Sequence, residues 1–205
     1  MTAPIIGISR HRMASDGAGV TTLVGFHGCP LRCRYCLNPH SFAEDSKRML
    51  LSPEALYERV KVDQLYFLAT GGGVTFGGGE PLLYAAFLKE FRRLCGARWH
   101  LCAETSLSVP WESVKMAAEV IDEFIVDCKD TNKEIYRRYT GQGNETMLEN
   151  LGRLVELIGA DRVTVRVPLI PAYNKEEDRE KSVARLSALG VTRVDLFTYK
   201  TENMR

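Results

Sequence analysis

Hydrophobic positions recur along the chain in two alternating patterns. Short runs rich in β-branched and aromatic residues predict strands at residues 21–26, 73–76, 99–103, 123–127, 162–168 and 192–198. Longer segments, with apolar residues three or four positions apart, predict helices at residues 52–62, 82–94, 111–120, 132–139, 145–158 and 175–189. Strands therefore alternate with helices along the whole chain.

Capping residues support several of these helices. Ser52 has the position of an N-cap and is followed by proline, while Thr131 with Glu134 and Asn174 with Glu177 have capping-box spacing. The alternation predicts an α/β fold with a parallel sheet and helices outside it, either curled into a partial barrel or open and doubly wound. In both arrangements ligands bind at the carboxyl ends of the strands.

Length and composition indicate one globular domain. The 205 residues are 45% hydrophobic and 26% charged, which predicts a single domain over residues 1–205. The net charge of +1 offers no broad field for nucleic acid or an anionic membrane, so we expect neither as a partner. The first apolar run breaks at Gly7, short of a signal peptide or membrane span, and we expect a cytoplasmic protein.

Three of the six cysteines lie in the segment GFHGCPLRCRYCLNP, directly after the first predicted strand. Their C-x3-C-x2-C spacing suits a tight loop that binds three irons of a cubane cluster and leaves the fourth iron open. The alternatives are a Cys3His zinc site completed by His27 or His40, or three reduced cysteines without metal. The other cysteines share no ligand spacing and are expected to be small buried hydrophobic residues: Cys95, Cys102 and Cys128.

This loop resembles the signature of the radical S-adenosylmethionine (SAM) superfamily, C-x3-C-x-aromatic-C. More narrowly, DGAG at 16–19, the cysteine loop, GGGVTFGGGEP at 71–81 and VDCKD at 126–130 resemble, in the same order, the activating enzymes of glycyl radical enzymes. The resemblance implies a partial (β/α)6 barrel and a [4Fe–4S] cluster on Cys29, Cys33 and Cys36. It also implies cleavage of SAM to a 5′-deoxyadenosyl radical that removes hydrogen from a glycine of a partner glycyl radical enzyme. A low-potential electron donor such as flavodoxin or ferredoxin is the second implied partner.

The resemblance assigns cofactor contacts to residues near the strand ends. A glycine–glycine–glutamate stretch that meets the ammonium of SAM is matched by Gly78, Gly79 and Glu80. Glycine lets the main chain approach a ligand closely. Lys129 and Arg166 are implied partners of the cofactor's carboxylate or ribose; a surface lysine and a structural ion pair are the alternatives. Tyr35 is implied to cover the adenine, with ordinary core packing as its alternative.

Four further positions complete the implied site. Glu104, Thr105 and Asp127 align with positions that lie near the cofactor and can hold a monovalent cation, for which oxygen ligands are suited. Asp16 aligns with an aspartate close to the substrate peptide, and the resemblance makes it, together with Lys129, a catalytic residue.

The chain also departs from the family pattern. Glu104 stands where the motif has aspartate, GAGVTT replaces a GPG-x-R pattern, and Tyr199 and Lys200 occupy a stretch where the activating enzymes usually carry histidine. These departures leave a second hypothesis open, in which the same chemistry modifies a small molecule or a ribosomal peptide. A zinc-binding interaction module without catalysis is a third hypothesis.

Overall fold

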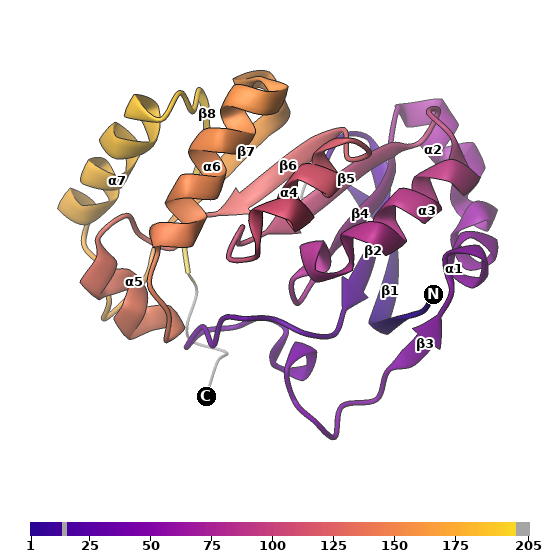
Figure 1. The fold of residues 1–205 in the computed structure, drawn as a ribbon, viewed down its shortest axis with the longest axis horizontal. Helices are drawn as coiled ribbons and strands as arrows, with labels where there is room; N and C mark the ends of the chain where they lie inside the picture. Colours follow the sequence, from indigo (N-terminus) through magenta and orange to yellow (C-terminus); the bar gives the residue numbers. More distant parts are fainter. Residues whose placement is uncertain (14–15, 200–205) are drawn as a thin grey trace. The chain divides into compact units, whose positions relative to one another are not determined.

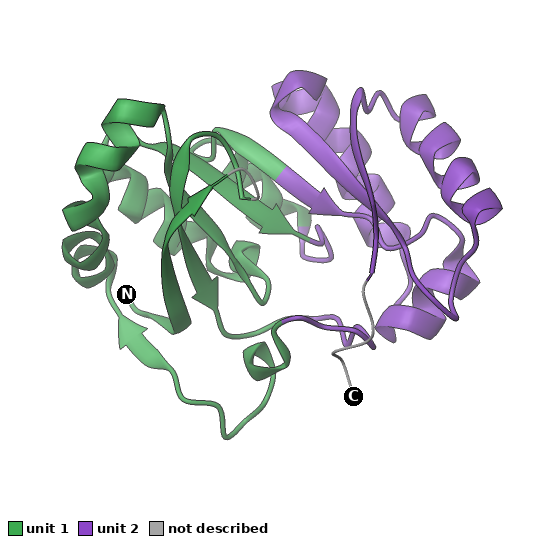
Figure 2. Ribbon diagram, turned by 180° about the vertical axis from the view of Figure 1, so that it is seen from behind, with its two compact units in different colours: residues 1–29, 38–105, 111–124 green, residues 30–37, 106–110, 125–205 purple. Residues whose placement is uncertain are grey.

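The computed structural model describes residues 1–13 and 16–199, and its elements are labelled in Figure 1. The chain divides into two compact units, which Figure 2 distinguishes by colour. Unit 1 comprises residues 1–29, 38–105 and 111–124, and unit 2 comprises residues 30–37, 106–110 and the described residues from 125 onward. The cysteine loop passes from unit 1 to unit 2 after Cys29. The prediction of one domain over the whole chain stays a prediction.

Unit 1 is built on a mixed sheet. Its strands are β1 (Ala3–Met13), β2 (Val20–Phe26), β3 (Met49–Leu51), β4 (Gly73–Gly78) and β5 (His100–Thr105). Their order is β3-β1-β2-β4-β5, with β1 antiparallel to β2 and β3, and with β2, β4 and β5 parallel. Phe26 pairs with Gly78 at the carboxyl ends of β2 and β4. The segments that follow these two strands therefore begin side by side.

The helices of unit 1 are α1 (Pro53–Val60), α2 (Gln64–Thr70), α3 (Ala85–Cys95) and α4 (Trp111–Ala118), with short 3-10 helices at Pro39–Ser41, Lys61–Asp63 and Pro81–Tyr84. Helix α1 begins as predicted, because the Ser52 side chain accepts a hydrogen bond from Ala55 N. Helix α3 packs against α1 and α4 and buries Phe91, which contacts the ring of Trp99. This aromatic layer forms part of the core under the parallel strands.

Unit 2 continues the alternation of strands and helices. Strand β6 (Glu123–Asp127) enters it from unit 1, followed by α5 (Lys133–Thr140), α6 (Glu145–Ile158), a 3-10 helix at Ala160–Arg162, β7 (Val163–Leu169), α7 (Glu176–Ala188) and β8 (Arg193–Thr198). Strands β7 and β8 are parallel. Tyr136 and Tyr139 of α5 are fully buried in the core of this unit. No helix in the described part of the chain is long and apolar enough to cross a membrane.

The predicted elements are present, with three additions and two corrections. The predicted strands are β2 and β4 to β8, and the predicted helices are α1 and α3 to α7; β1, β3 and α2 were not predicted. The capping predictions were wrong by one residue: Asn132, not Thr131, accepts the hydrogen bonds of Glu134 N and Ile135 N, and the Lys175 amide donates to Asp178 at the start of α7. At α5 the Asn132 side chain caps the first turn, whereas the N-cap of α7 is Lys175, whose side chain accepts no capping hydrogen bond.

Candidate functional site

The residues that lead into the cysteine loop are held firmly in unit 1. Strand β2 ends at Phe26, after which His27 N donates to Pro4 O over 2.9 Å and Gly28 N donates to Ser41 O over 2.6 Å. The Tyr84 hydroxyl donates to the carbonyl of His27 over 2.7 Å. Cys29 follows directly, so its backbone starts from a fixed point.

The glycine–glutamate stretch lies against this same point. Gly79 N donates to Phe26 O over 2.9 Å, and Glu80 N donates to Gly28 O over 2.7 Å. Gly78 has a φ of +86°, and a Cβ there would lie 2.7 Å from Gly25 Cα. A Cβ at Gly79 would lie 2.9 Å from Phe26 O and would also collide with Gly28 O. Only glycine allows this approach, and the two motifs are therefore joined through their backbones.

Glu80 is the most deeply buried acidic side chain among the predicted site residues. It is fully buried, and its Oε1 accepts hydrogen bonds from the Thr105 hydroxyl over 2.7 Å and from Leu82 N over 3.2 Å. These contacts fix the carboxylate at the carboxyl ends of β4 and β5. Glu80 and Thr105, predicted separately, are thus brought together by the structure.

Glu104 and Thr105 lie next to each other on β5 and therefore point to opposite faces of the strand. Thr105 points to Glu80, whereas the carboxylate of Glu104 lies beside Gly77, where a Cβ would come within 2.9 Å of Oε2. The side chain of Glu104, longer than the aspartate of the family pattern, therefore occupies the space that Gly77 leaves by having no side chain.

Asp16 is buried and has a cationic partner that the sequence reasoning missed. Arg12 forms a two-point contact with its carboxylate, in which Nη2 donates to Oδ1 over 3.2 Å and Nε donates to Oδ2. The hydrogen bond to Asp16, opposed by burial and helped by the charges of Asp16 and Glu104, raises the pKa of Arg12. The spacing of four residues between Arg12 and Asp16 was the available signal in the sequence.

In unit 2, Lys129 is the centre of a charged group. Its ammonium lies 3.1 Å from Asp127 Oδ2 and donates to the Tyr199 hydroxyl over 3.2 Å. Burial lowers the pKa of Lys129, but the attraction of Asp127, followed by that of Tyr199 and Cys33, leaves it well above its usual value. Burial raises the pKa of the Cys33 thiol, and the charge of Lys129 opposes this. Lys129 is therefore a cation that favours the thiolate of Cys33.

The structure gives packing partners to two other predicted residues of unit 2. Tyr35 makes edge contacts with Tyr173 at 5.7 Å and Tyr139 at 6.1 Å between ring centroids. Arg166 Nε lies 3.7 Å from Asp195 Oδ2 across the β7–β8 pair. These contacts agree with the alternatives given for the two residues, which are core packing for Tyr35 and a structural ion pair for Arg166. Lys200 lies outside the described residues.

The cysteines separate into two groups. The thiols of the loop are partly buried and form no disulfide: Cys29, Cys33 and Cys36. Cys102 and Cys128 are fully buried, as predicted, and burial raises the pKa of Cys128 to about 12. Cys95 is only partly buried, and burial raises its pKa to about 11. Within the described residues, no three His, Cys, Asp or Glu side chains come close enough to hold a single metal ion.

The chain is similar to one family model and to proteins that are named as activating enzymes. A family model described as the radical SAM superfamily matches residues 23–186. The pyruvate formate-lyase-activating enzyme of Clostridium pasteurianum is 30% identical over 188 residues, covering 91% of this chain and 78% of that protein. The (2S)-3-sulfopropanediol dehydratase activating enzyme of Klebsiella oxytoca is 28% identical over 231 residues, covering 82% of this chain and 72% of that protein.

A solved structure supports the fold. Streptococcus suis SuiB bound to S-adenosylmethionine is similar with a TM-score of 0.65 and 14% identity, over 87% of this chain and 42% of that one. The predicted α/β fold of the radical SAM type is thereby confirmed. The matched segment begins within β2 and contains both the cysteine loop and the glycine–glutamate stretch. The chain belongs to the radical SAM superfamily.

Proposed function

We propose that this protein is an activating enzyme that reductively cleaves SAM and removes a hydrogen atom from a backbone glycine of a partner glycyl radical enzyme. The observation that carries the proposal is the alignment with the activating enzyme of Clostridium pasteurianum, because it extends over 91% of this chain. The similar proteins are named for different partner enzymes. The partner is therefore proposed here only by class.

The loop thiols fit a cluster with one open iron. Three cysteines are available without a disulfide, and at Cys33 the charge of the Lys129 ammonium opposes the larger effect of burial, which raises the pKa of this thiol. When bound, the [4Fe–4S] cluster supplies the electron that cleaves SAM to methionine and a 5′-deoxyadenosyl radical. In this proposal Cys29, Cys33 and Cys36 hold that cluster.

The stretch from Gly78 to Glu80 fits the methionine part of SAM. The glycines let this stretch lie directly against the backbone of residues 25–28, where a Cβ at Gly78 or Gly79 would collide, and this contact holds Glu80 in place. Glu80 presents a carboxylate oriented by Thr105 and Leu82 N, which suits an ammonium in a desolvated site. These contacts would orient the cofactor before the electron arrives.

The charged group of unit 2 fits the other polar parts of the cofactor. We assign Lys129 to the carboxylate or ribose of SAM and Asp127 to its orientation, because their ion pair keeps the ammonium protonated at neutral pH. Tyr35 and Arg166 are assigned to the adenine and to a second anionic contact. Their observed partners, Tyr173 and Asp195, would then position these side chains.

A cavity in unit 1 supports a peptide substrate. It has a volume of about 640 Å³ and is lined by residues that include Ser9, Gly25, Asn38, Ser46 and Gly78. Three glycines and several short polar side chains leave backbone groups accessible, which suits hydrogen bonds to an extended or turned peptide. We place the glycine-bearing loop of the partner here, and we assign Asp16 with Arg12 to its positioning.

Two broader assignments accompany this function. We propose that residues 1–205 act as one domain, because the cysteine loop and β6 each continue from one unit into the other. We also infer a cytoplasmic location, since oxygen-sensitive clusters and low-potential electron carriers require a reducing compartment.

The function is tested by anaerobic incubation of the reconstituted protein with SAM, reductant and a candidate glycyl radical enzyme. We expect a glycyl radical signal on the partner in electron paramagnetic resonance, and deuterium in the 5′-deoxyadenosine when the partner's glycines are deuterated. If 5′-deoxyadenosine forms without deuterium and no candidate partner shows a radical signal, the proposed function fails. The result would then favour modification of a small molecule or a ribosomal peptide.

A further inference from the structure

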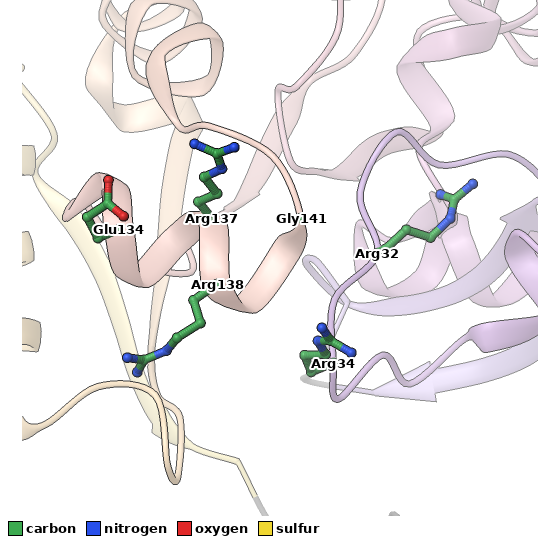
Figure 3. A pocket seen from close by; sticks show the side chains of 6 residues that line it. All are labelled: Arg32, Arg34, Glu134, Arg137, Arg138 and Gly141. Atoms are coloured by element: carbon green, nitrogen blue, oxygen red, sulfur yellow. The ribbon is translucent and has the colours of Figure 1, made fainter.

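Unit 2 carries a strongly cationic cavity beside the cysteine loop. It has a volume of about 630 Å³ and is lined by four arginines, one glutamate and a glycine: Arg32, Arg34, Arg137, Arg138, Glu134 and Gly141. Figure 3 shows Arg32 and Arg34 on the loop and Arg137 and Arg138 on helix α5. We call these four side chains the arginine surface.

The arginine surface has unused capacity for an anionic partner. All four arginines are exposed. Within the part of the chain that the structure describes, the guanidinium groups of Arg34 and Arg137 make no hydrogen bond or salt bridge to the protein, whereas Arg138 donates to Tyr173 O over 2.7 Å. Because the whole chain has a net charge of only +1, this concentration of charge is local. Such a patch steers an oppositely charged partner to one place.

The position of this surface connects it to the cluster. Arg32 and Arg34 are the two neighbours of Cys33 in the sequence. Arg32 N donates to Thr140 O over 2.8 Å and Arg34 N donates to Tyr139 O over 3.1 Å, which pins the loop to the end of α5. A molecule docked on the arginines would therefore lie one residue from a proposed cluster ligand, on a backbone that is held in place.

We propose that the arginine surface docks a small acidic electron-carrier protein of the flavodoxin or ferredoxin kind. The carrier would lose one electron and the cluster would gain it, with no bond formed or broken. The proposal rests on the proposed function only in that Cys33 is a cluster ligand. The partner's glycine loop is assigned to the cavity of unit 1, which is lined by one acidic and one basic residue besides His40 and so lacks this concentration of positive charge.

A double charge reversal tests the docking directly. Arg34→Glu with Arg137→Glu removes two exposed cations, and the matched control, Arg93→Glu with Arg153→Glu, makes the same change in net charge at exposed arginines elsewhere. The probe is a purified acidic flavodoxin, whose binding is measured by biolayer interferometry at low and high salt. We expect the test variant to bind about tenfold or more weakly at low salt, the control to bind like the original protein, and added salt to reduce the difference. Equal binding by both variants would refute the proposal.

A second readout separates docking from damage to the cluster. The formation of 5′-deoxyadenosine is measured once with flavodoxin and its reductase and once with dithionite, after iron content and circular dichroism are shown to be unchanged. We expect the test variant to lose rate only with flavodoxin. A loss of rate with dithionite as well would overturn the proposal, because the substitutions would then act on the site itself.

The glycyl radical partner is the main rival occupant. If flavodoxin binding is unchanged while dithionite-driven radical formation on the partner falls, the surface binds the partner and the proposal fails. If no partner radical forms with any variant but the flavodoxin-dependent loss persists, the docking stands and only the proposed function fails.

Discussion

Glu80 offers the most direct test of the site, because its carboxylate is fully buried and accepts hydrogen bonds from Thr105 Oγ1 and Leu82 N. Glu80→Gln is nearly isosteric, and its amide oxygen can still accept from Thr105 Oγ1 and Leu82 N, at 2.7 and 3.2 Å in the original protein. The fold and the cysteine loop should therefore keep their structure. What the variant loses is the negative charge that the proposed site offers to the ammonium of SAM.

The magnitude follows from the kind of bond that is lost. A hydrogen bond with a charged partner contributes about 1.5–3 kcal/mol. Its loss would weaken SAM binding by about 10- to 150-fold. Thr105→Val is a useful comparison, because it removes the 2.7 Å hydrogen bond from the Thr105 hydroxyl but leaves the Glu80 carboxylate in place. Its effect on SAM affinity should be smaller, while its effect on the free energy of unfolding should be about 1–3 kcal/mol, since a buried acceptor loses a donor.

The assay is isothermal titration of SAM into anaerobically reconstituted protein, with iron and sulfide determined on the same samples. We expect Glu80→Gln to keep its iron and lose affinity, and Thr105→Val to keep its iron and lose mainly stability. The reasoning fails if Glu80→Gln binds SAM as tightly as the original protein. It also fails if iron and SAM binding decrease together, because Glu80 would then support the cluster.

Three other changes test neighbouring parts of the site. Alanine at any loop cysteine should lower bound iron and abolish 5′-deoxyadenosine formation, and product from any single variant would exclude that residue as a ligand: Cys29, Cys33 or Cys36. Gly79→Ala should cost about 1–3 kcal/mol of unfolding free energy or more and reduce bound iron, because its Cβ would collide with the carbonyl of Gly28; unchanged thermal unfolding would contradict this. Lys129→Met should cost about 1–3 kcal/mol, less than a fully buried pair, since Asp127 is 32% exposed. Because folding raises the pKa of Lys129, this difference in unfolding free energy should be constant between about pH 6 and 9. It should decrease as the pH rises above the ordinary lysine pKa of about 10.4 and be lost only above the higher pKa of the folded protein.

Local patterns were enough to predict much of this protein. The cysteine spacing, the glycine run and the alternation of strands and helices are properties of short segments, and each indicated its chemistry or its element without tertiary information. The family match over residues 23–186 confirmed the superfamily that these segments indicated. Strand β1 was missed because Gly7 and the polar residues 9–12 interrupt its hydrophobic pattern. It is a strand because β2 and β3 pair with it on both sides.

The tertiary structure decided which side chains meet. Arg12 turns toward Asp16, and Thr105 orients Glu80 from 25 positions away in the sequence. The backbone of the cysteine loop is joined to the last turn of α5, which brings arginines from two separate segments around one cavity. Such contacts depend on how strands are ordered and how loops return, and these are set by burial and hydrogen bonding between distant segments. The sequence alone therefore determined the chemistry that the chain can carry, while the fold determined which charges surround it.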